Sequence, residues 1–214
     1  MTALGASVGQ LAERVVALRA TIAAERRLLI GIAGAPGAGK TTLARGVVAR
    51  LAEIGVGAAH VPMDGFHLAD VALDALGRRD RKGAPDTFDP AGYAALLGRL
   101  AAGDEVWAPA FERDLEQPLA QAIHVGSDVR VVVSEGNYLL LQAPEWRVVR
   151  DRFDEIWFCV LDDELRRARL IARHIEFGKD PDRARAWVAR VDEDNARLVA
   201  PGAAAADLLV DLSA

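Results

Sequence analysis

The apolar residues of the chain fall into two patterns that alternate along it. Short apolar runs predict strands of a buried parallel sheet, and they lie at residues 28–33, 58–63, 129–133, 155–161 and 206–212. Stretches with apolar residues at helical spacing, or with helix-capping signals, predict helices, and they lie at residues 7–26, 41–54, 68–76, 90–103, 162–177 and 181–199. The chain is therefore predicted to be an α/β protein, in which ligands collect beyond the carboxyl ends of the strands.

A less regular stretch at residues 105–114 contains proline and aromatic residues. Because Pro109 lacks the N–H group that a central strand needs, we expect an edge strand or an irregular strand there. Residues 123–125 are expected to pair with it as an added β element. Phe111 and Arg113 are candidates for lining an acceptor site, and ordinary edge packing stays open as the alternative.

Length and composition narrow the class of protein. The chain has 214 residues, of which 51% are hydrophobic and 27% charged, as expected for a single globular domain over residues 1–214. Its formal net charge of −5 provides no basic field for nucleic acid. The single Cys159 lies in an apolar run, so we expect a small core residue and not a nucleophile. A dimer contact through residues 7–26 stays open.

The sequence also bears on the compartment. A single cysteine suits a reducing environment. No apolar run approaches the length of a membrane span, and the first residues lack a signal-peptide pattern. We therefore expect a cytoplasmic protein that is not embedded in a membrane.

A glycine-rich segment between the first predicted strand and the next helix has the spacing G-x-x-x-x-G-K-[ST] of a phosphate-binding loop. Glycine at its ends lets the backbone bend so that successive N–H groups point at phosphate oxygens. Lys40 is expected to reach the β- and γ-phosphates, and the Thr41 hydroxyl is placed to bind Mg²⁺. A turn without ligand is the alternative. The residues of this loop are Gly34, Ala35, Pro36, Gly37, Ala38, Gly39, Lys40 and Thr41.

Two acidic residues follow predicted strands. Asp64 directly follows the segment at residues 58–63, and its carboxylate is expected to face an acceptor hydroxyl, although Asp64-Gly65 also fits a simple turn. Glu135 follows the strand at residues 129–133 and is the expected second half of a Mg²⁺–nucleotide site. Its alternative is a carboxylate that ends a strand in solvent.

Two groups of basic residues are candidates for contact with anions. In the charge-dense stretch at residues 77–86, Arg81 or Lys82 could approach an anionic substrate, but a solvated loop is the favoured interpretation. Arg166, Arg169 and Arg173 fall on one face of the helix at residues 162–177. We interpret this helix and the next as a lid that lays guanidinium groups on the transferring phosphate, with a solvated basic stripe as the alternative.

Three of these segments together resemble the uridine kinase, phosphoribulokinase and bacterial pantothenate kinase group of P-loop kinases. They are the glycine-rich loop, MDGFH at residues 63–67 and EGNYL at residues 135–139. The forms MDGFH, RKGAPDTFD, EGNYLL and ARLIARH look most like the branch of fructose transport system kinases.

The resemblance covers about residues 28–200 and implies a P-loop NTPase fold, a three-layer α/β/α domain. It implies a mainly parallel five-stranded sheet with a small β addition near residues 105–125. It also implies a helical lid at about residues 162–200.

The resemblance further implies which residues act. ATP would bind along Gly34 to Thr42, which adds Thr42 to the loop. Asp64 would orient or deprotonate the acceptor hydroxyl, and Glu135 would lie beside Mg²⁺. The remaining expected site residues are the catalytic Lys40, the lid residues Arg169 and Arg173, and the substrate residues His67, Arg81, Phe111, Arg113 and Tyr138.

The expected activity is ATP-dependent phosphorylation of a hydroxyl on a small metabolite, such as a sugar like fructose, a nucleoside or a pantothenate-like alcohol. Nucleoside kinases of the group usually follow the lid arginine with Asp, whereas His174 follows Arg173 here, which weakens a nucleoside assignment. A nucleotide-dependent switch or metallochaperone-type GTPase is the main alternative, but the chain has no N-K-x-D stretch for guanine. An AAA-type ATPase module would leave Asp64 without a role.

Overall fold

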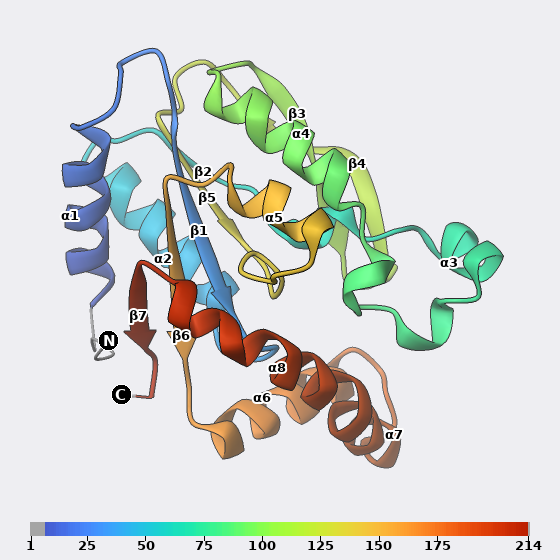
Figure 1. The fold of residues 1–214 in the computed structure, drawn as a ribbon. Helices are drawn as coiled ribbons and strands as arrows, with labels where there is room; N and C mark the ends of the chain where they lie inside the picture. The colour runs from blue at the N-terminus through green and yellow to red at the C-terminus, as the bar shows by residue number, and fades with distance from the viewer. Residues whose placement is uncertain (1–6, 214) are drawn as a thin grey trace.

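The computed structural model describes residues 7–213 and contains a central five-stranded parallel sheet (Figure 1). The strand order is β2-β5-β1-β6-β7. The strands are β1 (Leu28–Gly34), β2 (Ala58–His60), β5 (Val131–Glu135), β6 (Glu155–Val160) and β7 (Leu208–Asp211). The α/β class and the mainly parallel five-stranded sheet expected from the sequence are confirmed. Because the strands run in one direction, their carboxyl ends meet at one edge of the sheet.

Helices cover both faces of this sheet. The helices α1 (Val8–Arg19) and α2 (Lys40–Glu53) pack on one face, and α4 (Pro90–Ala101) and α5 (Pro144–Arg150) pack on the other. Successive residues of β1 alternate between the two cores, since Ile30 and Ile32 join one core while Leu29 and Ala33 join the other. This alternation makes every residue of β1 buried and explains its continuous apolar sequence.

Some predicted elements have different ends in the structure. Ser7 caps α1 with a hydrogen bond from the Gln10 N–H, but the helix ends at Arg19 and not near residue 26. The strand predicted at residues 58–63 is β2, which ends at His60, and a 3₁₀ turn follows at Met63–Phe66. A short helix, α3 (Asp70–Leu76), comes next. Asp89 caps α4 as predicted, because its side chain accepts from the Gly92 N–H.

An antiparallel hairpin forms the small β addition. It consists of β3 (Val106–Glu112) and β4 (Gln117–Val125), and its register shifts between Ala108 and Ala110. Pro109 lies at this irregularity, as its missing N–H leads one to expect. The hairpin packs against the 3₁₀ turn that carries Asp64.

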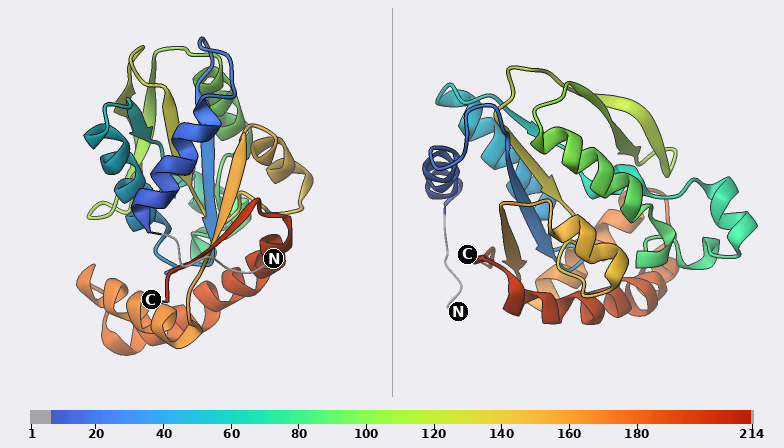
Figure 2. Two further views of the ribbon diagram at one scale, coloured as in Figure 1. Left: turned by 90° about the vertical axis from the view of Figure 1, so that its left-hand side faces the viewer. Right: turned by 45° about the horizontal axis from the view of Figure 1, so that its top comes forward.

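Three helices near the C-terminus lie across the carboxyl ends of the strands. They are α6 (Asp163–Glu176), α7 (Pro181–Trp187) and α8 (Glu193–Val199), and Figure 2 shows them from two further sides in orange to red. A π-helical turn, Val188–Asp192, connects α7 to α8, so the single helix predicted at residues 181–199 is nearly continuous. Within the described residues, no helix has both the length and the hydropathy needed to cross a bilayer.

Candidate active site

The glycine-rich loop joins β1 to α2, and the side chain of Lys40 folds back to bond to the loop backbone. Gly37 and Gly39 have φ angles of +79° and +90°, in the left-handed region that glycine tolerates. The Nζ of Lys40 donates to the carbonyl oxygen of Ala35 at 2.9 Å and to Oδ1 of Asn137 at 2.7 Å. Burial lowers the pKa of Lys40 from its ordinary value, and the nearby Glu135 carboxylate opposes this shift. The ammonium group is therefore fixed at the carboxyl end of the sheet.

Thr41 and Glu135 meet across the β1–β5 pair. The Oγ1 of Thr41 donates to Oε1 of Glu135 at 2.9 Å, and the same Oε1 lies 3.6 Å from Nε2 of His60. Burial raises the pKa of the Glu135 carboxyl, but His60, Lys40 and Thr41 together outweigh it and hold the pKa below its usual range. The carboxylate is thus ionised, and its oxygens are of the kind that Mg²⁺ binds.

The donor chemistry of this pair fits Mg²⁺. The ion usually takes one or two protein oxygens and completes its shell with phosphate oxygens and water. Within the part of the chain that the structure describes, no group of three His, Cys, Asp or Glu residues is arranged to hold a metal. A site built from a hydroxyl, one carboxylate and the nucleotide itself is compatible with that finding.

Asp64 is placed by a tight turn that follows β2. Its side chain is 31% exposed, and Oδ2 lies 3.6 Å from the Nη2 of Arg113 on the hairpin turn. The next residue, Gly65, contacts β3 so closely that a Cβ there would lie 2.4 Å from the carbonyl oxygen of Pro109. Glycine at this position therefore lets the turn approach the hairpin and keep the Asp64 carboxylate next to Arg113.

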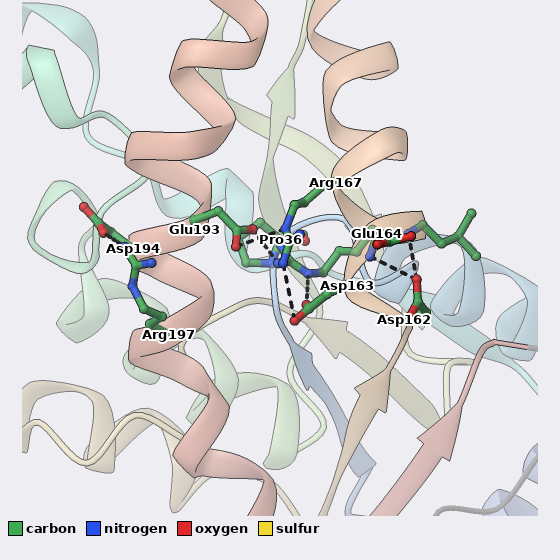
Figure 3. A network of polar contacts seen from close by, with 10 residues as sticks. Pro36, Asp162, Asp163, Glu164, Arg167, Glu193, Asp194 and Arg197 are labelled. Atoms are coloured by element: carbon green, nitrogen blue, oxygen red, sulfur yellow. Dashed lines mark hydrogen bonds and ion pairs between the residues drawn. The ribbon is translucent and has the colours of Figure 1, made fainter.

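The helix α6 packs directly on the glycine-rich loop. A Cβ at Gly37 would lie 2.7 Å from Cγ of Leu170, which leaves no room for a side chain between loop and helix. The guanidinium group of Arg166 donates to the Pro36 carbonyl oxygen at 3.3 Å and to Asp163 at 3.0 Å, and it also bonds to Glu193 of α8. Figure 3 shows this network around Pro36, with Glu193 on one side and Asp163 on the other.

The three arginines on one face of α6 have different surroundings. Arg166 is buried and holds the loop, so it is not a solvated residue. Arg173 lies at the cavity between loop and lid, where burial lowers its pKa from the ordinary value. Arg169 lines a second hollow on the other side of the loop.

A cavity of about 300 Å³ lies between the loop, the Asp64 turn, the hairpin and the lid. It brings together most of the residues that the sequence indicates for catalysis and substrate binding. They are Lys40, Thr41, Asp64, His67, Phe111, Arg113, Glu135 and Arg173.

Two expected substrate residues lie elsewhere among the described residues. Arg81 is paired with Asp86 on the surface, at 2.8 Å, and its neighbour Lys82 lines the cavity instead. Tyr138 is fully buried, and its hydroxyl donates to the carbonyl oxygen of Gly83. The Tyr138 hydroxyl therefore holds the backbone of the segment at residues 81–89, whereas the preceding residue, Asn137, lines the cavity.

The sequence indicates no role in the site for Asn137 or Gly65. It groups Arg166 with the arginines expected to lie on the phosphate, whereas the structure bonds Arg166 to the Pro36 carbonyl oxygen. Asn137 lies two residues after Glu135 in the segment EGNYLL, and its position after a buried strand is a signal that it could reach the site. The role of Gly65 depends on the approach of β3, and that of Arg166 on the approach of α8. Neither contact leaves a local pattern in the sequence.

The second hollow opens beside the amino end of α2 and has a volume of about 590 Å³. It shares Gly37, Lys40, Thr41, Arg113 and Arg173 with the first cavity. Its other walls are Gly39, Thr42, Leu43, Arg45, Arg169, Leu170 and the apolar side chains of Val8 and Leu212. The first cavity and the second hollow thus adjoin each other along the glycine-rich loop.

Comparison with known sequences identifies relatives over most of the chain. The model of the phosphoribulokinase/uridine kinase family matches residues 29–213. The uncharacterized protein YggC of Escherichia coli (strain K12) is 33% identical over 195 residues, which are 90% of this chain and 81% of YggC. A Schizosaccharomyces pombe protein that carries the provisional name uridine kinase C227.14 is 33% identical over 163 residues, 72% of this chain and 69% of that protein.

Solved structures share the same architecture. A protein from Silicibacter sp. TM1040 that carries the provisional name fructose transport system kinase is 36% identical, with a TM-score of 0.83 over 96% of this chain and 99% of that chain. YFH7 from Saccharomyces cerevisiae is 19% identical and has a TM-score of 0.78 over 98% of this chain and 99% of that chain, which shows a common fold. The overall fold of this chain is therefore one that solved proteins share.

Proposed function

This chain belongs to the phosphoribulokinase/uridine kinase family, and we propose that it is an ATP-dependent kinase that transfers the γ-phosphate to a hydroxyl group of a small metabolite. One observation carries the proposal: Lys40 of the phosphate-binding loop and the carboxylate of Asp64 line the same cavity. Phosphoryl transfer needs alignment and charge neutralisation more than covalent help from the protein, and this cavity supplies groups for both.

The direction of the nucleotide follows from the two spaces beside the loop. If the γ-phosphate faces Asp64 in the first cavity, the nucleoside must leave on the other side of the loop, toward the second hollow. That hollow offers the apolar side chains of Val8 and Leu212 and the guanidinium group of Arg169, which suit the face of a base. ATP would therefore span the loop, with its phosphates on residues 34–42.

Each charged residue then has a role in the transfer. Lys40 and Arg173 would lie beside the β- and γ-phosphates and offset the charge that spreads over the oxygens. Thr41 and Glu135 would hold Mg²⁺, which supplies further neutralisation of the phosphates when it is bound. Asp64 would hold the acceptor hydroxyl in line and accept its proton as the new bond forms.

The lid contributes by excluding water. Lys179 at the α6–α7 turn lies 3.5 Å from Glu116 of the hairpin turn, and Asn195 of α8 lies 3.4 Å from the carbonyl oxygen of Gly83. These contacts support the proposal that α6 to α8 act as a lid over the cavity, so that the γ-phosphate would meet the acceptor and not bulk water. We propose residues 162–200 as this lid within a single domain, in a cytoplasmic enzyme whose partner is a small molecule.

Acceptor-dependent ADP release tests the proposal. Purified protein with Mg²⁺ and ATP would be mixed with sugars, nucleosides or pantothenate-like alcohols, and GTP would replace ATP in a parallel series. A kinase gives ADP at a rate that rises with one class of acceptor. Slow nucleotide hydrolysis that no acceptor changes, with GTP favoured over ATP, would instead identify a nucleotide switch and overturn the proposal.

A further inference from the structure

We infer that the acceptor is an uncharged molecule with two neighbouring hydroxyl groups, one held by the Asp64 carboxylate and the other by the Nε2 atom of His67. This inference rests on the proposed kinase function and concerns the substrate class of the same cavity. Two observations support it. One is the acceptor nitrogen of His67 that has no partner among the described residues, and the other is the set of ion pairs that the cations near the acceptor already form.

The imidazole of His67 is fixed in one tautomer. Its Nδ1 lies 2.8 Å from the backbone carbonyl oxygen of Asp64. A carbonyl oxygen only accepts, so Nδ1 must carry the hydrogen, and Nε2 of the neutral ring is then a bare acceptor. Burial lowers the pKa of His67 from its ordinary value, which keeps the ring neutral near pH 7.

The free nitrogen of this ring is accessible. Among the described residues, Nε2 of His67 has no hydrogen-bond partner, yet it is absent from the buried polar atoms that lack one. Since His67 lines the cavity, we place this accessible atom at the cavity wall. The ring centroid lies 4.0 Å from that of Phe88 and 4.6 Å from that of Phe111, so neighbouring aromatic rings hold the imidazole in place.

Two acceptors therefore lie on one short turn. The carboxylate oxygens of Asp64 accept hydrogen bonds, and Nε2 of His67 does the same. Hydroxyl groups on adjacent carbons provide two donors for these two acceptors, whereas an isolated alcohol satisfies only one of them. The Phe111 ring beside them provides an apolar surface for the C–H groups of such a molecule.

The cations of the cavity divide into two sets. The first set lines the part of the first cavity that the second hollow does not share, which we call the acceptor half, and its cations are already paired. Lys82 lies 2.6 Å from Asp70, and Arg79 lies 2.8 Å from the same carboxylate. Lys179 lies 3.5 Å from Glu116. A phosphate or carboxylate on the acceptor would have to compete with Asp70 for Lys82 and Arg79, and with Glu116 for Lys179.

The second set borders the phosphate-binding loop. Lys40, Arg113 and Arg173 line both the first cavity and the hollow on the nucleotide side. They are placed to neutralise the transferring phosphate and not a charge at the far end of the acceptor. The described part of the acceptor half thus suits a neutral polyhydroxyl compound.

The test compares three matched probe series in the ADP-release assay. The first contains D-fructose, D-ribose and ribitol, the second contains deoxy analogues that lack one of two adjacent hydroxyls, and the third contains phosphate esters of the same sugars. We expect neutral compounds with adjacent hydroxyls to raise ADP release. Higher kcat/KM with the phosphate esters, or equal kcat/KM with the deoxy analogues, would overturn the inference.

Variants of His67 test its role separately. His67→Phe keeps an aromatic ring between Phe88 and Phe111 but removes the acceptor nitrogen. We expect its KM for the neutral acceptor to rise about tenfold, with the KM for ATP unchanged, as for the loss of one hydrogen bond. Discrimination against the deoxy analogue should fall by the same factor, which a merely structural role would not produce.

Two further variants make the result decisive. His67→Gln offers an amide oxygen as acceptor and should retain part of the discrimination. His124→Phe is the matched control, because His124 lies on exposed β4 and pairs with Glu105 at 2.8 Å. Unchanged discrimination in both His67 variants would refute the assignment. Failure of the kinase proposal looks different, since wild-type protein would then release no additional ADP with any series and both conclusions would fall.

Discussion

The Nη1 atom of Arg166 lies 3.3 Å from the carbonyl oxygen of Pro36, so the first lid helix is hydrogen-bonded directly to the phosphate-binding loop. The same guanidinium group reaches Glu193 on the third lid helix, and its side chain is almost fully buried. One arginine therefore fixes the loop and two parts of the lid relative to each other. These contacts restrain the shape of the loop.

Replacing Arg166 by methionine is expected to destabilise the protein and to weaken nucleotide binding. The change removes the donor to the Pro36 carbonyl oxygen and leaves Glu193 with only its more exposed partner Arg167, at a cost of about 2–4 kcal/mol. The midpoint of urea unfolding should fall, and the KM for ATP should rise about tenfold. Arg185→Met is the control, because Arg185 forms an exposed pair with Asp182 at 2.8 Å. An unfolding midpoint equal to that of the control would contradict this role.

Glu135→Gln is expected to impair the use of Mg²⁺. The amide has nearly the same shape but no charge, so the pairing of Thr41 with an ionised group is lost. We expect kcat to fall by about 100-fold or more and the Mg²⁺ concentration for half-maximal rate to rise. Titration of the rate with Mg²⁺ measures both effects, and Glu105→Gln at an exposed position serves as the control. A wild-type Mg²⁺ profile would remove Glu135 from the metal site.

Gly65→Ala is expected to shift the position of the Asp64 carboxylate while leaving the aspartate itself in place in the sequence. The new Cβ would lie 2.4 Å from the Pro109 carbonyl oxygen, so the turn and the hairpin must separate. We expect a loss of about 1–3 kcal/mol in stability and a fall in kcat, while ATP affinity is nearly unchanged. Gly9→Ala in α1 is the control, because its Cβ meets only an ordinary contact at 3.7 Å. Equal kcat in the two variants would show that the close approach is not needed.

The sequence predicts the residues of this site that lie at strand ends. Glu135 ends β5, Asp64 lies in the turn after β2, and Lys40 begins α2 after the loop that follows β1. Parallel strands bring their carboxyl ends together, so motif and topology suffice to place these residues. Tyr138 is different: the sequence does not show which side of the turn after β5 faces the core, and the structure buries its ring. Its position depends on packing against Phe88 and Trp146.

Long-range contacts explain the other differences. Arg81 and Lys82 are adjacent and both basic, and only the fold decides that Arg81 turns to Asp86 while Lys82 turns to the cavity. The helix signal at residues 162–177 correctly placed Arg166 and Arg173 on one face. It could not reveal that Arg166 would be buried by Glu193, which lies 27 residues away in the sequence.

Leu212→Glu is expected to weaken nucleotide binding, because it places a charge in the second hollow, where we propose that the base binds. Leu212 follows β7 and lies 3.3 Å from the position of a Cβ on Gly39, where it lines the second hollow with Val8. A carboxylate there would meet the base and the nearby α-phosphate, so we expect the Kd for ATP to rise about tenfold or more. Isothermal titration with a non-hydrolysable ATP analogue measures this change. Leu119→Glu on exposed β4 is the control, and equal Kd values for the two variants would exclude a base site at Leu212.

The central claim is that a nucleotide held at residues 34–42 points its γ-phosphate at the carboxylate of Asp64. Its most direct test is the acceptor-dependent rate of ADP release by Asp64→Asn, measured alongside the affinity of the same protein for ATP. The account predicts that kcat falls by about 100-fold or more while the Kd for ATP stays within about twofold of wild type. A variant that keeps the wild-type rate with its preferred acceptor would contradict it.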